Sequence, residues 1–146
     1  ELRQLREGAI DLKPYPDAEA VADRLVKTNP RLPREKAQWL ARQWAQAGSD
    51  GQWRILGDAA HKIVNPYLYR VDEVQEIFQR ISAPLLAVQA SDDSLGQWWK
   101  GKYTLAQYHQ RLQAVPQHRI VQIEDAGHML HHDQPQALAQ ALEAFL

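Results

Sequence analysis

The sequence of 146 residues contains no cysteine, which excludes disulfide bonds and thiolate chemistry. An excess of charge of one sign is also lacking, since 17 Lys and Arg residues stand against 18 Asp and Glu. This balance favours neither nucleic acid nor an anionic membrane surface as a partner. No apolar run reaches the roughly 18 residues that a membrane span needs. A hydrophobic content of 45% is nevertheless sufficient for a buried core.

The N-terminus lacks both an initiator Met and a signal peptide. The chain begins inside a helix-like stretch, residues 1–7, which Gly8 is expected to end. Its length allows one domain or less than one domain of a larger fold. We therefore expect the chain to be a piece of a longer protein. The missing signal peptide favours a cytoplasmic location, although a chain without cysteine also fits a periplasm.

Residues 1–80 are expected to form helices and loops that are rich in Trp and Tyr. Asp17 can cap one helix, and a second helix starts at about Arg34. The segment 48–51, Gly-Ser-Asp-Gly, predicts a turn, and residues 52–56 after it predict a short extended piece. A further amphipathic helix is indicated by apolar residues at helical spacing: Val71, Val74, Ile77, Phe78 and Ile81.

The pattern changes at about residue 82, where strands and helices begin to alternate. Leu85-Leu86-Ala87-Val88 is a short apolar run typical of a buried strand, and the run 120–123 predicts another. A helix opened by Thr104 separates them, and a last helix follows, for which Asp133 and Gln136 predict a capping box. This alternation predicts a parallel pair of strands.

A Gly-His turn, Gly127-His128, follows the second of these strands. Gly127 allows a tight turn that a Cβ atom would obstruct. His128 is therefore expected at the carboxyl edge of the sheet, where open α/β sheets keep their ligands. An imidazole at this edge is suited to act as a general base.

From residue 81 onward, the sequence resembles the C-terminal end of the α/β-hydrolase fold. The matching pieces are residues 81–88, Asp92, the segment Ala126-Gly127-His128-Met129-Leu130-His131 and Pro135. The resemblance implies an α/β fold class with a short parallel strand pair and flanking helices. Residues 81–146 would be the C-terminal portion of the hydrolase core. Residues 1–80 are similar to the helical cap that this family inserts before its last strands.

The resemblance also implies a catalytic triad, which in this family runs Ser, then Asp or Glu, then His along the chain. His128 matches the base, and Asp92 matches the acid, with Asp93 as the alternative. Trp98, Trp99 and Met129 lie close to these positions in the sequence and are the candidate substrate contacts. The resemblance implies no cofactor, and the tryptophans suggest a small, apolar or aromatic molecule as the substrate.

Two departures from the family pattern affect this assignment. No Gly-x-Ser-x-Gly motif occurs, and Ser49 lacks its spacing, so the nucleophile is not expected in this chain. Gln89 stands where the family often has Gly, which leaves the choice between Asp92 and Asp93 less defined.

These observations predict that the chain is part of a hydrolase that cleaves an ester or a related bond. We expect this part to be inactive without the missing N-terminal half of the same fold. An Asp nucleophile, as in dehalogenases and epoxide hydrolases of this fold, is an alternative. A non-catalytic binding protein derived from the fold is another.

His128, His131, His132 and Asp133 could also suggest a metal site, because zinc accepts such nitrogen and oxygen ligands. Three ligands at this spacing across a turn rarely converge without a fourth from elsewhere. We therefore expect no metal here, and we expect His131 and His132 at the rim of the site or in solvent.

Overall fold

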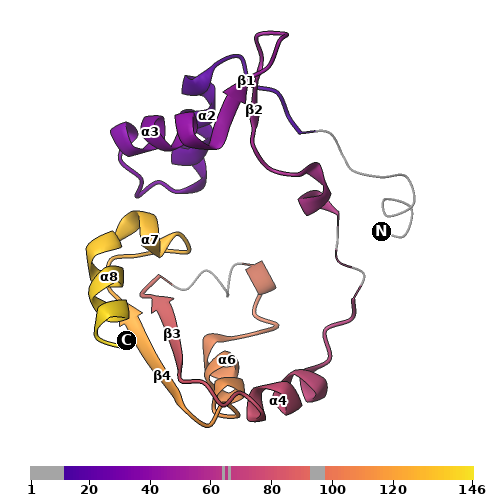
Figure 1. The fold of residues 1–146 in the computed structure, drawn as a ribbon, viewed down its shortest axis with the longest axis vertical. Coiled ribbons are helices and arrows are strands. Elements are labelled where there is room, and N and C mark those ends of the chain that lie inside the picture. Colours follow the sequence, from indigo (N-terminus) through magenta and orange to yellow (C-terminus); the bar gives the residue numbers. More distant parts are fainter. Residues whose placement is uncertain (1–11, 64, 66, 93–97) are drawn as a thin grey trace. The chain divides into compact units, whose positions relative to one another are not determined.

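The structure is a computed structural model that describes residues 12–63, 65, 67–92 and 98–146. The helix expected over residues 1–7 and the alternative acid Asp93 lie outside the described residues. The chain forms two compact units, Glu1–Leu68 and Tyr69–Leu146 (Figure 1). The assignment of residues 1–80 as a cap and 81–146 as a core portion stays a prediction.

The first unit contains the two helices that the sequence predicts, α2 (Ala18–Thr28) and α3 (Arg34–Trp44). Asp17 caps α2 as expected, because its carboxylate accepts a hydrogen bond from the Ala20 N–H at 2.7 Å. The apolar faces of both helices meet in a core whose buried members are Tyr15, Val21, Ala22, Leu25, Leu32, Ala37, Leu40, Ala41 and Ala45.

A short antiparallel hairpin completes the first unit, with β1 (Ala45–Ala47) paired to β2 (Trp53–Ile55). Strand β1 was not expected from the sequence, because Ala-Gln-Ala has little preference for strands; pairing with β2 imposes the extended conformation.

In the turn that connects β1 to β2, the Arg54 guanidinium and the Gln52 N–H bind Asp50 and lower the pKa of its carboxyl to about 2. A 3₁₀ turn, Ala59–Lys62, follows.

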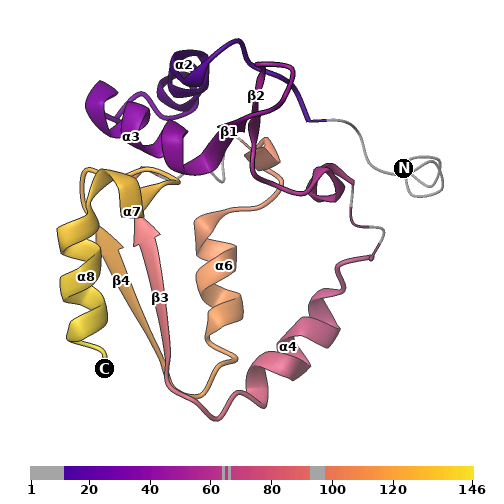
Figure 2. The ribbon, with the colours of Figure 1, turned by 45° about the horizontal axis from the view of Figure 1, so that its top comes forward.

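The second unit is built on the predicted parallel strand pair. Strands β3 (Leu85–Ala90) and β4 (His118–Ile123) are in register from Leu85 opposite His118 to Ala90 opposite Ile123. Figure 2 shows α6 (Leu105–Leu112) beside β3, and α8 (Pro135–Glu143) beside β4. In chain order the elements are α4 (Val71–Gln79), β3 (Leu85–Ala90), α6 (Leu105–Leu112), β4 (His118–Ile123), α7 (Leu130–Asp133) and α8 (Pro135–Glu143).

A chain of polar side chains joins α6 to both strands and gives Gln89 a role. The amide of Gln89 donates to Gln122 Oε1 at 2.8 Å, and Gln122 in turn donates to Glu124 at 2.7 Å. His109 Nε2 lies 2.6 Å from Gln89 Oε1, so Nε2 carries the proton and donates. The polar side chain that departs from the family pattern therefore fixes α6 against the sheet.

Of the two capping boxes that the sequence predicts, the structure contains one. Thr104 and Gln107 cap α6 reciprocally, as expected. The capping box of Asp133 with Gln136 was wrong: α8 begins at Pro135, and the side chain of its N-cap residue, Gln134, makes no capping hydrogen bond to the helix. Asp133 instead ends α7, and its carboxylate accepts a hydrogen bond from the Gly127 N–H.

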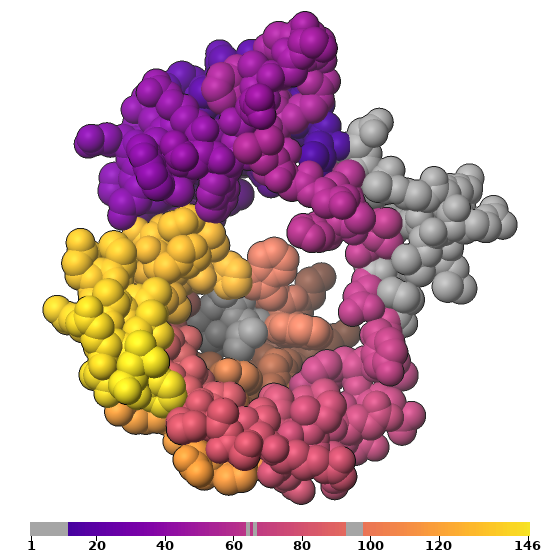
Figure 3. Space-filling view, in the orientation of Figure 1, coloured from indigo at the N-terminus to yellow at the C-terminus, as the bar shows by residue number. Residues whose placement is uncertain are grey.

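Apolar surface of the second unit remains exposed. Neither α4 nor α8 contains a buried residue, and Ile77 on the apolar side of α4 is 62% exposed. Figure 3 shows the surface of α4 uncovered at the edge of this unit. Among the described residues, no strand other than β4 pairs with β3. No helix in the described part of the chain is both long and apolar enough to cross a bilayer.

We expect the chain, expressed by itself, to associate through this surface, because a two-stranded sheet is marginally stable and exposed apolar faces attract one another. Light scattering during gel filtration should show oligomers. Ile77→Glu should shift the distribution toward the monomer. Gln79→Glu adds the same charge on the polar side of α4 and should not. A monomeric parent chain would contradict the expectation.

Candidate active site

The carboxyl ends of β3 and β4 are joined by backbone hydrogen bonds beyond the sheet itself. The Ser91 N–H donates to the Ile123 carbonyl at 2.9 Å, and the Asp92 N–H donates to the Ala126 carbonyl at 3.0 Å. These bonds hold the loop with Asp92 against the turn that precedes His128. Parallel pairing brings both predicted site residues to the same edge of the sheet, where we expected them.

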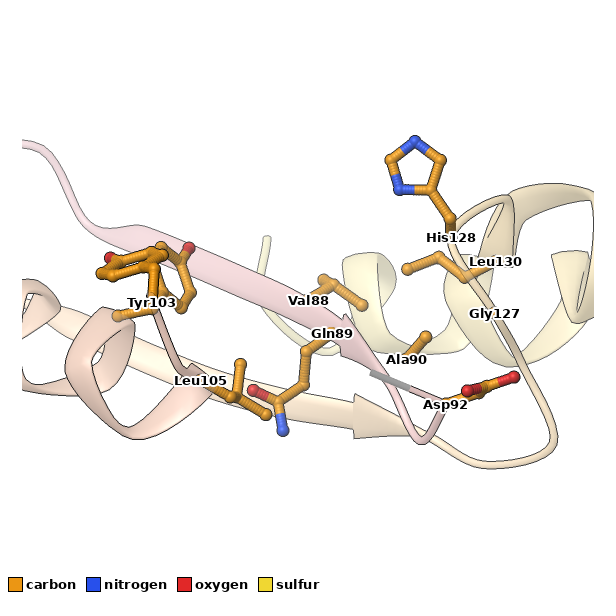
Figure 4. Close-up of a pocket in the computed structure, with 10 residues that line it drawn as sticks. Val88, Gln89, Ala90, Asp92, Tyr103, Leu105, Gly127, His128 and Leu130 are labelled. Carbon is orange, nitrogen blue, oxygen red and sulfur yellow. The ribbon is translucent and has the colours of Figure 1, made fainter. Parts of the chain in front are cut away.

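Asp92 and His128 line one pocket of about 380 Å³. Part of the pocket wall is the end of β3, and part is α6 with the segment before it (Figure 4). Among the described residues of the lining, no side chain is Ser, Thr or Cys. The lining residues are Val88, Gln89, Ala90, Asp92, Tyr103, Leu105, Tyr108, Gly127, His128 and Leu130.

The two predicted catalytic side chains do not face each other in this structure. Figure 4 shows the imidazole of His128 pointing away from the carboxylate of Asp92. His128 is exposed, and its ring has no hydrogen-bond partner among the described residues. The structure thus brings the backbone of both residues together, while the hydrogen bond between their side chains stays a prediction.

The turn before His128 has a defined geometry. Asp125 adopts a left-handed conformation with φ 51°, which Asp tolerates better than most residues. Asp133 Oδ2 accepts from the Gly127 N–H at 2.9 Å, and Gln134 Nε2 donates to the Asp125 carbonyl at 3.2 Å. The sequence pattern had assigned Asp133 to a helix cap. It gave no signal for a contact six residues back along the chain.

An aromatic wall formed by Tyr103 and Tyr108 was also missed by the sequence analysis. Both rings line the pocket, and burial raises the pKa of the Tyr108 hydroxyl. The Arg111 guanidinium lies 4.4 Å from the centroid of the Tyr103 ring, within the range of a cation–π interaction. Tyr108 lies on the helix that the sequence predicts after Thr104, but no sequence signal indicated a place in the site. Its place on the wall depends on how α6 packs beside the sheet.

The three candidate substrate contacts that the sequence indicates differ in exposure. Trp98 is 76% exposed and Trp99 is 53% exposed, and the Trp99 ring meets Tyr103 edge-on, with centroids 6.1 Å apart. Met129 is half-buried and precedes α7. None of these three residues is part of the pocket lining. Their contact with substrate stays a prediction.

The histidines after the turn lie together without forming a metal site. The rings of His131 and His132 have centroids 4.1 Å apart. Within the described ranges, no three His, Asp or Glu side chains come together as a group that could hold a metal ion. Asp133, the remaining acidic member of the sequence pattern, binds the Gly127 N–H.

Several solved hydrolases have a similar fold. The chain superimposes on the thioesterase domain from the curacin biosynthetic pathway with a TM-score of 0.73 and 22% identity, covering 94% of this chain and 46% of that one. For E-2-(acetamidomethylene)succinate hydrolase the TM-score is 0.69 with 17% identity, covering 92% and 47%. For an esterase of Mycobacterium tuberculosis it is 0.70 with 18% identity, covering 90% and 42%.

The chain thus spans about half the length of the solved structures that it matches. No curated protein matches the sequence significantly. The sequence pattern that defines the alpha/beta hydrolase family matches residues 5–141, which is nearly the whole chain. The chain belongs to the alpha/beta hydrolase family.

Proposed function

We propose that this chain is the C-terminal half of a hydrolase that cleaves an ester or a related bond. His128 is its general base, and Asp92 orients and stabilises the His128 ring. The observation that carries the proposal is the junction of the two strand ends. The hydrogen bond of 3.0 Å from the Asp92 N–H to the Ala126 carbonyl keeps both residues at one edge of the sheet and at one pocket.

The role of His128 requires its ring to turn toward the acid. Exposed side chains change rotamer within picoseconds to nanoseconds, and no described group holds the His128 ring in its present orientation. Once turned, the ring can accept a hydrogen bond on one nitrogen and donate from the other to the Asp92 carboxylate. That carboxylate then fixes the tautomer and stabilises the imidazolium formed when His128 takes a proton.

The nucleophile and the oxyanion donors are assigned to sequence that precedes this chain. The absence of a Gly-x-Ser-x-Gly motif and the coverage of 42–47% of the solved hydrolases support this division. A Ser nucleophile in that preceding sequence gives an esterase-like enzyme, whereas an Asp nucleophile gives an enzyme of the dehalogenase or epoxide-hydrolase type.

The pocket supports an apolar or aromatic small molecule as substrate. Tyr103 and Leu105 present ring and aliphatic surface away from the Asp92 carboxylate (Figure 4), and Tyr108 lines the same pocket. Aromatic rings stack on such a wall with favourable offset or edge geometry. Trp98, Trp99 and Met129, at the surface nearby, are the outer contacts for a larger substrate.

We predict that residues 1–146 alone do not hydrolyse nitrophenyl esters above background, because they lack the nucleophile and the oxyanion donors. Removing a single such donor typically lowers kcat by about 10²–10³-fold. The longer polypeptide with its N-terminal half should be active, and His128→Ala in it should abolish turnover in a spectrophotometric assay. His131→Ala, three residues away, serves as the control. An unchanged rate with His128→Ala would remove the catalytic assignment of His128, whereas no turnover by the longer polypeptide would favour the non-catalytic binding protein.

We further predict that Asp92 is the acid of the active, longer polypeptide. Asp92→Asn should lower kcat by on the order of 10⁴-fold, because an amide stabilises the wrong tautomer of the histidine. Asp93→Asn is the matched control and should lower kcat little. The reverse order of the two effects, measured at saturating substrate, would transfer the role to Asp93.

A further inference from the structure

We propose that Asp133 and Gln134 are positioning residues for His128, because they hold Gly127 and Asp125 of the turn before it, whereas the Asp92 backbone holds Ala126. The inference rests on the proposed function of His128 as the base. It differs from the triad in its mechanism: Asp92 acts on the imidazole ring, whereas Asp133 and Gln134 act on the backbone that carries it.

Each backbone unit of the turn has a different partner. Gln134 Nε2 donates to the Asp125 carbonyl at 3.2 Å and lies 3.5 Å from the Asp125 carboxylate. The Ala126 carbonyl accepts from the Asp92 N–H at 3.0 Å. Asp133 Oδ2 accepts from the Gly127 N–H at 2.9 Å. Three consecutive residues are thus fixed directly before His128.

The turn needs such support because its conformation is not the one the chain adopts most easily. The left-handed φ of 51° at Asp125 is uncommon for a residue with a Cβ atom, and such backbone persists where the surroundings stabilise it. Ala126 and Gly127 are buried, so an unpaired backbone group there would lose its hydrogen bond to water without replacement. The carboxylate of Asp133 satisfies the Gly127 N–H with a charge-assisted bond, which is stronger than a neutral one.

The backbone of Asp133 and Gln134 is itself fixed by hydrogen bonds. The Asp133 N–H donates to the Met129 carbonyl at 3.2 Å, and the Gln134 N–H donates to the Leu130 carbonyl at 2.8 Å. Pro135 begins α8 immediately afterwards. The segment from Asp125 to Gln134 therefore closes on itself, with His128 between the turn and α7. A displacement of Gly127 would move the Cα atom of His128 with it.

The test uses the longer polypeptide with its N-terminal half and compares four variants with the parent. Asp133→Ala removes the acceptor and should lower kcat by about 10²-fold, the loss expected for a reacting group displaced by about 1 Å. KM should change little, because the aromatic pocket wall is not altered. Asp133→Asn keeps an acceptor oxygen and should recover most of kcat.

Gln134→Glu removes the amide donor at nearly constant size and should also lower kcat. Gln136→Ala, at an exposed position on α8, is the matched control and should leave kcat unchanged. An Asp133→Ala or Gln134→Glu variant with the kcat of the parent would overturn the proposal. Equal losses in Asp133→Ala and Asp133→Asn would overturn it as well, because an acceptor oxygen would then not be what matters.

Amide hydrogen exchange provides a readout that does not depend on activity. The Gly127 amide should exchange slowly in the parent and at least about tenfold faster in Asp133→Ala, while amides of the α2 and α3 helices keep their rates. Equal exchange of Gly127 in both proteins would overturn the proposal. If the parent hydrolyses no ester, the proposed function fails, and the exchange of Gly127 alone decides whether Asp133 holds the turn.

Discussion

The parallel pairing of β3 with β4 is the constraint on which the candidate site depends. Six consecutive residue pairs keep the two strands in register, and the backbone bonds of Ser91 and Asp92 continue the connection past their carboxyl ends. A shift of one residue would reverse the face to which each side chain points. It would also separate Asp92 from the turn before His128. The register therefore determines the position of the site before any side chain of the pocket contributes.

Polar side-chain contacts fix the elements around this sheet edge. The chain of His109, Gln89 and Gln122 fixes α6, and α6 carries Tyr108 to the pocket wall. In the turn before His128, Asp133 fixes the Gly127 amide. The side chains that would react, Asp92 and His128, are therefore carried by backbone that other residues hold. A preformed backbone with a mobile imidazole is compatible with a site that becomes complete when the nucleophile is present.

The exposed apolar faces of α4 and α8 fit the same interpretation. In an α/β sheet, helices of this kind cover strands on both faces, and such strands are buried. Here every residue of β3 is only half-buried, and no residue of α4 is buried. The second unit thus has apolar helix and strand surface that no described residue covers completely. The coverage of about half of each solved relative is consistent with that surface.

The sequence by itself determined the elements whose signals are local. Asp17 and Thr104 cap helices through contacts three residues away, and the apolar run at Leu85–Val88 forms a strand. The order of strand, helix and strand fixed the parallel pairing and brought Asp92 and His128 to one edge.

Contacts between distant segments were decided only by the tertiary structure. Strand β1 exists because β2 pairs with it, Tyr108 reaches the pocket because α6 packs beside the sheet, and Asp133 leaves its expected cap for the Gly127 amide. Each of these features depends on a group that lies elsewhere in the chain or beyond the reach of a helix cap. A local sequence pattern does not show which of these groups will be close enough to interact.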